Sequence, residues 1–509
     1  MNGKLFYGDI HNHCNISYAH GNLSDALENA RQRLDFCSVT GHAHWTDIPE
    51  RNERTDHIVD FHERGFEKLK SNWRATLETL RVAEEPGSFL TFPGFEVHSS
   101  AHGDRAIVYR DPQGELLYPE TIPALHRQLR ELSITDGAAL ALPHHIGYHR
   151  GARGINWESF DEKVSPVVEI FSMHGAAETT EGPLPFLHSM GPADSGSTVR
   201  EGLAQGHVFG FVANTDHHSA HPGSYGHGMH GVWATALSRE AIWQALFERR
   251  TFALTGDKIR LDYSIGEAPM GAIRPHTGPR ELFIELAGGA PIDYVDLIHN
   301  NRLIRRITPV EMARPDAIRQ TRTGWIRSKI YLEVGWGPRG KPVPWTVEFG
   351  IEEGRVLDVE PRFRGPDVLS PEQEADSEGG AFYSWCRPIG DRSVHFETRT
   401  YGNPTTSTPG TQGVCLEVEM PRNGKVHGTL NGTTVETTME RLIAGGKSGH
   451  LRHEIDSPAW LLHRVPEAWE LYWTIREDAV PELAAGDFLY TRVRQQNNQW
   501  AWGSPVFVR

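Results

Sequence analysis

Cysteine is scarce in this 509-residue chain. Scattered thiols without a Cys-x-x-Cys pair are typical of a reducing compartment and argue against a disulfide framework. The N-terminal residues also lack the long apolar core of a signal peptide. We therefore expect a cytoplasmic protein with reduced thiols. The four cysteines are Cys14, Cys37, Cys386 and Cys415.

Long apolar runs and an excess of positive charge are also missing. No stretch of about 18 apolar residues occurs, so no membrane-spanning helix is expected. Lys and Arg total 51 against 66 Asp and Glu, which gives a formal net charge of −15. Such a chain offers no basic field to attract nucleic acid or an anionic membrane. We expect a small-molecule substrate as the partner, and the composition leaves a homo-oligomer open.

Histidine, by contrast, is abundant and unevenly distributed. Of the 28 histidines, 21 lie at or before His230, which indicates that the first half of the chain carries the chemistry. The length predicts two or three domains. We place the first at 1–260, a second at 261–365 and a third at 381–509, with the acidic, Pro- and Gly-containing stretch 366–380 as a linker.

The first half alternates strand-like and helix-like segments, and six strand-like runs each lead into a histidine or a carboxylate. This alternation predicts an α/β fold with a parallel β/α barrel, in which reactive groups lie at the carboxyl ends of the strands. Residues 105–110 are expected as an added hairpin arm. The six runs cover residues 5–11, 34–40, 89–96, 138–143, 167–172 and 209–214.

The residues at these strand ends form a coherent set of metal ligands. His11 and His13 are two positions apart, so on a strand both rings point to one face, and Asp216 and His218 repeat this spacing. Imidazoles with a few carboxylates are ligands for Zn, Mn or Fe, and Glu96 has two oxygens with which to bridge two ions. The candidates are too many for one four-coordinate ion, so we expect two or three divalent transition-metal ions.

Five short segments occur in the order seen in the PHP (polymerase and histidinol phosphatase) superfamily, which the chain resembles over residues 1 to about 275. Within it the chain is similar to the branch that includes carbaryl-hydrolase-like and DUF3604 proteins. The resemblance implies a distorted (βα)7 TIM-like barrel with a two- or three-metal site at its mouth. The segments are His11-Asn-His13, Val39-Thr-Gly-His42, Gly94-Phe-Glu96, Pro143-His144 and Asp216-His-His218.

The resemblance also assigns individual roles. The ligand after Glu96 is His98 or His102, and His102 is preferred because it precedes a stretch similar to the family's hairpin. Where the family commonly has Asp before the histidine of its second motif, this chain has Gly41, which removes a hydrogen-bond partner for an imidazole. The other ligand roles fall on His11, His13, His20, His42, Glu96, His144, Asp216 and His218.

Four further polar residues are candidates for supporting roles. His145 and His174 are placed to protonate a leaving group or bind substrate, because imidazole titrates near neutrality; hydrogen bonding to the ligands is the alternative. Arg105 is a candidate for binding an anionic substrate oxygen, with a plain surface charge as the alternative. Glu169 either orients a ligand or is a buried structural acid.

The second half changes character near residue 260. Short alternating strands separated by turns predict a β-sandwich-like region, followed by a β-rich C-terminal region. Trp500 and Trp502 alternate on a strand and are expected to fill a core.

Together these features predict a metal-dependent hydrolase that uses a metal-bridged hydroxide, which needs no nucleophilic Ser or Cys. Phosphoester bonds of a small molecule are the first expectation. Carbamate or carboxyl-ester hydrolysis at the same site is an alternative, and a catalytically inactive ligand-binding protein is another.

Overall fold

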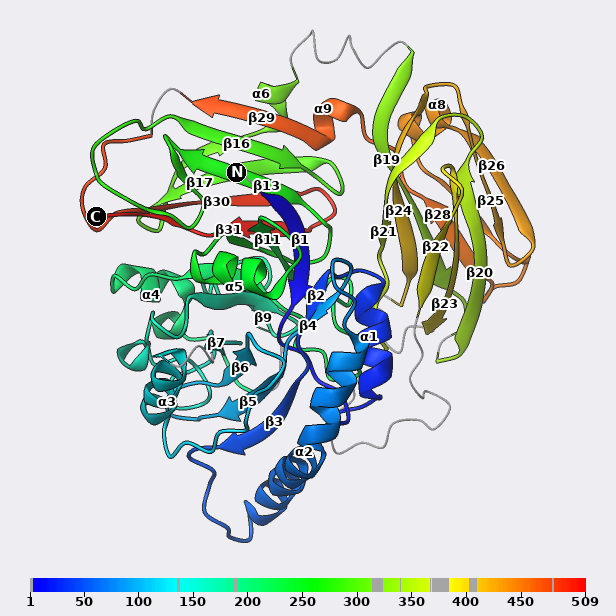
Figure 1. The fold of residues 1–509 in the computed structure, drawn as a ribbon. Helices are drawn as coiled ribbons and strands as arrows, with labels where there is room; N and C mark the ends of the chain where they lie inside the picture. Colours follow the sequence, from blue (N-terminus) through cyan, green and yellow to red (C-terminus); the bar gives the residue numbers. More distant parts are fainter. Residues whose placement is uncertain are drawn as a thin grey trace.

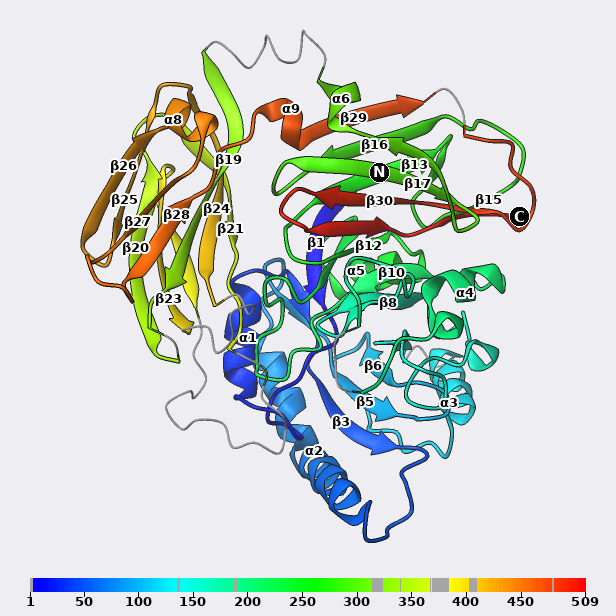
Figure 2. The ribbon, with the colours of Figure 1, turned by 180° about the vertical axis from the view of Figure 1, so that it is seen from behind.

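The computed structural model is a mixed α/β protein with many strands and few helices, arranged in three units (Figures 1 and 2). A metal-ligand-rich first unit lies below one β-sandwich and beside a second in the view of Figure 1. The structure describes residues 3–134, 138–186, 190–313, 324–338, 340–366, 368, 384–401, 410–477 and 480–509. The predicted linker 366–380 therefore lies almost entirely outside the described residues.

The first unit contains short buried strands with helices between them. The helix α2 (Asp56–Ala83) is 28 residues long and points away from both sandwiches in Figure 1. The other helices are α1 (Leu23–Arg31), α3 (Ile122–Ile134), α4 (Val199–Ala204) and α5 (Arg239–Phe247). The strands are β1 (Lys4–Asp9), β2 (Phe36–Cys37), β3 (Thr40–Trp45), β4 (Leu90–Thr91), β5 (Gly94–His98), β6 (Arg105–Tyr109), β7 (Ala139–Pro143), β8 (Val167–Ser172), β9 (Gly175–Ala176), β10 (Gly210–Ala213), β11 (Met229–Ala234) and β12 (Thr251–Leu254).

Strand pairing in this unit is only partly parallel. β1, β2 and β4 pair in parallel, as do β3 with β5 and β8 with β10. β5–β6–β7 and β1–β11–β12 are antiparallel. Six residues join β5 to β6, which is too short for a parallel crossover and makes the expected hairpin arm. Over the described residues, the hydrogen-bonded ladders thus form separate strand-rich sheets and not a continuous (βα)7 barrel.

The first sandwich combines strands from both ends of the C-terminal half. β16 (Leu282–Ala287) pairs with β29 (Tyr472–Glu477), and β17 (Ile292–His299) pairs with β30 (Phe488–Gln495). Its other strands are β13 (Arg260–Ile265), β14 (Ala268–Pro269), β15 (Ile273–Arg274), β18 (Arg302–Ile307), β31 (Trp500–Gly503) and β32 (Val506–Val508), with the short helices α6 (Pro309–Met312) and α9 (Ala468–Leu471).

The second sandwich uses the residues between these two groups of strands. Two five-stranded sheets enclose a separate core that includes Trp345 and Phe396. The predicted division between 261–365 and 381–509 does not coincide with a boundary between sheets, because both sandwiches take strands from each side of it. The strands are β19 (Trp325–Trp336), β20 (Pro342–Ile351), β21 (Arg355–Pro361), β22 (Trp385–Ile389), β23 (Ser393–Tyr401), β24 (Gln412–Pro421), β25 (Lys425–Leu430), β26 (Thr433–Thr438), β27 (Lys447–His450) and β28 (Pro458–Leu462), with helix α8 (Met439–Ala444).

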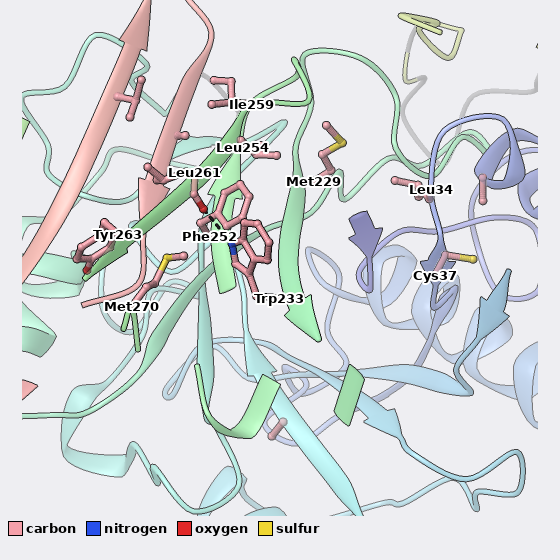
Figure 3. Close-up of a cluster of buried hydrophobic side chains, with 14 of the residues drawn as sticks. Leu34, Cys37, Met229, Trp233, Phe252, Leu254, Ile259, Leu261, Tyr263 and Met270 are labelled. Atoms are coloured by element: carbon pink, nitrogen blue, oxygen red, sulfur yellow. Dashed lines mark hydrogen bonds between the residues drawn. The ribbon is translucent and has the colours of Figure 1, made fainter. Parts of the chain in front are cut away.

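The first unit and the first sandwich share one sheet and one core. β12 pairs with β31, so a single ladder runs from β1 through β11 and β12 into the C-terminal strands. Figure 3 shows Trp233 and Phe252 of this ladder beside Leu261 and Tyr263 of β13. The Trp233 indole N–H donates to the Leu261 carbonyl at 2.9 Å. Leu5 and Tyr7 of β1 pack against the same core, so burial of these large side chains holds the strand that leads into the histidine-rich site.

Candidate metal centre

The site begins where β1 ends. Asp9, the last residue of β1, is fully buried and accepts hydrogen bonds from the backbone N–H groups of His11, Thr215 and Gly223. It thereby ties the segment after β1 to the segment after β10. Burial raises the pKa of Asp9 to about 6, although its hydrogen bonds to Thr215 and Gly223 act in the opposite direction.

His13 lies at the centre of a first group of donor atoms. Its Nε2 is 3.3 Å from His11 Nε2, 3.1 Å from Asp216 Oδ1 and 3.3 Å from Glu96 Oε2. All four side chains are buried. Two imidazoles and two carboxylates that converge on so small a volume are a donor set for a divalent metal ion.

Glu96 joins this group to a second one. Its Oε2 faces His11, His13 and, at 3.8 Å, His42 Nε2. Its Oε1 lies 3.0 Å from His98 Nδ1 and 3.6 Å from His144 Nε2. The carboxylate therefore has the geometry of a bridge between neighbouring positions, as its two oxygens allow.

Asp216 closes the site from the loop after β10. Its Oδ1 is 3.6 Å from His218 Nδ1, and its Oδ2 is 2.8 Å from His174 Nε2. Its φ of 51° lies in the left-handed region, which non-glycine residues adopt at a cost. Groups of donors whose atoms lie within 4.8 Å of one another are His13–His42–His218, His11–Glu96–His144, His11–His13–Asp216, His42–Glu96–His98 and His144–His145–Asp216.

The imidazoles around Glu96 differ in their pKa values. Burial lowers the pKa of His42 and of His144 far below the ordinary value, and lowers that of His218 to about 3. Burial would raise the pKa of Glu96, but the surrounding imidazoles, His144 first, bring it well below its usual range. Burial would also lower the pKa values of His11 and His98, but Asp216 and Glu169 raise that of His11, and Glu96 and Asp104 raise that of His98. A metal ion that binds these two rings would displace a proton, because only the neutral imidazole coordinates a metal.

Unsatisfied buried atoms provide the test of whether these residues fit an ion. Among the described residues, both ring nitrogens of His144 and Oε2 of Glu96 are buried without a hydrogen-bond partner. Buried polar groups left without partners are costly, and a bound cation would satisfy Glu96 Oε2 and one ring nitrogen of His144. The residues present therefore fit a divalent metal centre.

Hydrogen bonds from outside the donor groups orient two of the histidines. Glu169 Oε2 lies 2.9 Å from His11 Nδ1, so His11 Nε2 is directed to the other donors. Ser17 Oγ lies 3.0 Å from His42 Nδ1. An Asp in place of Gly41 would require Leu69 to shift, because a Cβ there would lie 2.8 Å from Leu69 Cδ1. Ser17 thus supplies the partner that the sequence indicated was missing.

The choice between His98 and His102 is visible in the structure. His98 is buried between Glu96 and Asp104, with its Nδ1 2.9 Å from Asp104 Oδ2. His102 is half-buried, and its Nδ1 contacts Ser159 Oγ at 3.1 Å. His98, which the sequence placed second to His102, is therefore the one of the two that lies within the donor groups.

Three other predicted residues, His20, His145 and His174, each make a different contact near the centre. His20 is half-buried, and its backbone N–H donates to the His218 carbonyl at 2.9 Å. His174 Nδ1 contacts the Tyr148 hydroxyl at 2.7 Å, and His145 Nε2 lies 3.6 Å from Asp104 Oδ2.

Arg105 is neither on the surface nor directed at a carboxylate. It is fully buried, and its Nη1 donates to the backbone carbonyls of Gly103 and Asp104. Burial lowers its pKa to about 10. Arg153 is the guanidinium that faces the site, since its Nη1 lies 3.4 Å from Asp104 Oδ2 and it packs over Trp45. Sequence reasoning missed Ser17, Asp104 and Arg153, because each reaches the site from a loop without strand-end spacing.

Comparisons with known proteins identify relatives without an assigned function. A scan against protein-family models found no match. The chain is 26% identical over 283 residues to an uncharacterized protein of Chlamydia pneumoniae, a match that covers 50% of this chain and 45% of that protein. It is 30% identical over 173 residues to one of Chlamydia trachomatis, covering 31% and 28% of the two chains. The chain thus spans less than half the length of these relatives.

One solved structure was found by fold comparison. It is a two-domain protein of Bacteroides vulgatus that contains a predicted PHP-like metal-dependent phosphoesterase. The TM-score is 0.30 at 14% identity, over 60% of this chain and 83% of that one. Among the described residues, no helix is long and apolar enough to cross a membrane.

Proposed function

We propose that the chain is a metal-dependent hydrolase of the PHP type that acts on phosphoester bonds of a small molecule. The observation that carries the proposal is the arrangement of Glu96, whose two oxygens face different sets of imidazoles. When bound at such a site, divalent ions acidify water and polarise a substrate oxygen. The residue types and their order along the chain, which resemble those of the PHP superfamily, support the same reading.

The chain's own residues supply the orientation and the charge around the reaction. His174 Nε2 holds Oδ2 of Asp216, which leaves Oδ1 for the other donors. The Tyr148 hydroxyl, 2.7 Å from His174 Nδ1, completes a chain of groups that can move a proton to or from a leaving group. Arg153 is mostly buried and offers a guanidinium for the non-bridging oxygens of a phosphoryl group.

Carbamate or carboxyl-ester hydrolysis is the second candidate, and an aromatic wall favours it. Tyr148 packs edge-on against Phe186 at 4.7 Å between ring centroids, directly beside His174. Such a wall suits a substrate with an apolar leaving group. The metal-binding residues would be the same for both reactions.

A substrate panel separates these candidates. Purified protein reconstituted with Mn, Zn or Fe(II) is assayed on chromogenic phosphomonoesters, phosphodiesters, carboxyl esters and carbamates. We expect turnover of a phosphoester that Arg153→Met weakens chiefly through KM, because a cation for the phosphoryl oxygens is lost. Exclusive turnover of carbamates or esters would favour the second candidate. A metal-loaded protein inactive on every substrate would support a ligand-binding protein.

A further inference from the structure

The loop that carries Asp216 and His218 has a backbone that requires support. Asp216 and Ala220 have φ values of 51° and 52°, in the region that L-residues rarely adopt. Such conformations cost free energy and persist where surrounding contacts hold them. The source of those contacts is therefore part of how the metal centre is built.

On its inner side the loop is held by the segment at the end of β1. The His13 N–H donates to the His217 carbonyl at 2.9 Å, and the Asp216 N–H donates to the His11 carbonyl at 2.9 Å. These bonds fix the two ligand segments to each other. The restraint continues past His218, because the Ala220 N–H donates to the His13 carbonyl at 3.2 Å and the Gly223 N–H donates to Asp9 Oδ2 at 2.9 Å. The residues that follow Gly223 lie against a different part of the molecule.

On its outer side the loop contacts the second sandwich, at the segment that follows β21. The Tyr225 N–H donates to the Phe363 carbonyl at 2.8 Å, and the Gly365 N–H donates to Ser224 Oγ at 2.9 Å. Gly365 is packed against the ring between the two ligands: a Cβ there would lie 2.6 Å from His217 Nε2. The fit leaves no space for a larger residue.

Tyr225 is the residue of the loop around which this contact is organised. Its ring lies between three guanidinium groups, at 5.1 Å from Arg33, 5.6 Å from Arg362 and 4.8 Å from Arg364. Its hydroxyl donates to Asp257 Oδ1 at 2.7 Å. Cation–π contacts of desolvated guanidinium groups and a charge-assisted hydrogen bond are among the stronger polar contacts in a protein.

Arg362 connects this tyrosine to all three units. The side chain is 1% exposed and pairs with Asp257 at 3.2 Å and with Glu360 at 3.1 Å. It also donates to the Gly289 carbonyl of the first sandwich at 3.0 Å. If Arg362 moved away from Asp257 or Glu360, a buried charge would lose its partner at a high cost in free energy. This cost keeps Arg362 and its partners in one arrangement.

We infer that Arg362 is a positioning residue for the metal centre, and that the second sandwich holds the Asp216–His218 loop in its ligand-binding conformation through Arg362, Tyr225 and Gly365. The inference rests on the metal centre of the proposed function and adds a part of the chain more than 140 residues away from the ligands in sequence. It does not depend on which bond is cleaved.

The test compares four variants of the full chain with the wild type. Arg362→Met removes the charge, Arg362→Lys keeps it without the planar fork, and Gly365→Ala introduces a Cβ against His217. Arg355→Met is the matched control, because Arg355 is the first residue of β21, the strand that Arg362 follows, but pairs with Glu419 at the surface. Zn(II) affinity is measured by chelator competition, and the visible absorption spectrum of the Co(II) protein reports ligand geometry.

We expect Arg362→Met and Gly365→Ala to weaken Zn(II) binding by about 10- to 100-fold and to change the Co(II) spectrum. Arg362→Lys should restore part of the affinity, and Arg355→Met should match the wild type. If Arg362→Met does not fold, the Zn(II) affinity and the Co(II) spectrum of Gly365→Ala decide whether the inference holds. Folded variants with wild-type affinity and spectrum would overturn the inference while leaving the proposed function intact. A wild-type protein that binds no metal would overturn both.

Discussion

Glu96 and Asp216 decide how many ions the centre can accept, because each carboxylate directs its oxygens to different partners. Glu96 contacts His13 through Oε2 and His98 through Oε1. Asp216 contacts His13 through Oδ1 and His174 through Oδ2. His13 Nε2 therefore lies between the two carboxylates. Its loss would remove a metal donor that adjoins both of them.

His13→Ala and Asp216→Asn should each reduce kcat/KM by roughly 100-fold or more, because each removes a donor at the position where the nucleophile would be generated. His427→Ala, on β25 of the second sandwich, is the matched histidine control and should retain activity. Steady-state kinetics on the best substrate of the panel, with metal content measured on the same samples, makes the comparison. Near-normal turnover in either site variant would show that the ligand assignment is wrong.

At the residue scale, the spacing of residues close together in the sequence predicted most of the side chains in the candidate site. His11, His13, Asp216 and His218 were grouped because residues two apart lie on one face of an extended segment. In the structure both pairs follow their strands, since β1 ends at Asp9 and β10 at Ala213, and Asp216 has a φ of 51°. The spacing carried no signal for Ser17, Asp104 or Arg153. They reach the centre from loops, whose positions depend on contacts between segments distant in sequence.

Strand β31 belongs to two parts of the molecule. Trp500 and Trp502 stack at 5.8 Å between ring centroids, and their neighbours in the core include Phe171 of β8 and Phe211 of β10. The Trp502 indole N–H donates to Glu178 Oε2 at 2.9 Å. The C-terminal strand therefore completes the core behind the strands that lead into His174 and Asp216.

Trp502→Ala should lower the unfolding free energy by about 3–5 kcal/mol, because it leaves a cavity in the core and removes one of the hydrogen bonds to Glu178, which Tyr490 and Arg492 still bind. The folded fraction should keep its metal content and its KM. Thermal unfolding and kinetics measure the two effects, with Trp325→Ala as a control because Trp325 is 61% exposed. A stable Trp502→Ala variant with a raised KM would instead place the C-terminal half in the substrate site.

At the element scale, the existence of most strands followed from local patterns, whereas their pairing did not. The strand-like runs predicted at 167–172 and 209–214 lie at β8 and β10. The pairing of β16 with β29 joins segments about 190 residues apart, and no local pattern encodes such a partner. The sequence therefore indicated two β-rich regions but not that one is inserted within the other.

The three units of the molecule meet at buried charges. Arg33 follows α1, Glu360 lies at the end of β21, and Arg362 contacts both Glu360 and Asp257. Burial would raise the pKa of Glu360, but Arg362 and then Arg33 lower it to about 2. The ionised carboxylate is thus part of what holds the second sandwich against the first unit.

The pH dependence of stability should report this junction. The pKa of Glu360 is lower in the folded protein than its ordinary value of 4.5, so its contribution is present above that value and is lost as pH falls toward 2. Glu360→Gln should therefore melt below the wild type at pH 7, and the gap should narrow as the pH is lowered from 5 to about 3. Thermal unfolding across this range measures it. A constant gap would contradict the role of the carboxylate charge.

Metal binding should stabilise the whole molecule, because the centre joins β3 and β5 to the segments that follow β1, β7 and β10. We expect at least two transition-metal ions per chain by elemental analysis after reconstitution. A ligand that binds the folded state at 100 times its Kd adds about 2.7 kcal/mol, so Mn(II) or Zn(II) should raise the melting temperature of chelator-treated protein. Asp216→Asn removes a donor charge without a change in volume and should show a smaller rise, which ties the stabilisation to this centre. Less than about half an ion per chain, together with a melting temperature that metal does not change, would mean that the buried histidines and carboxylates have a structural role without an ion.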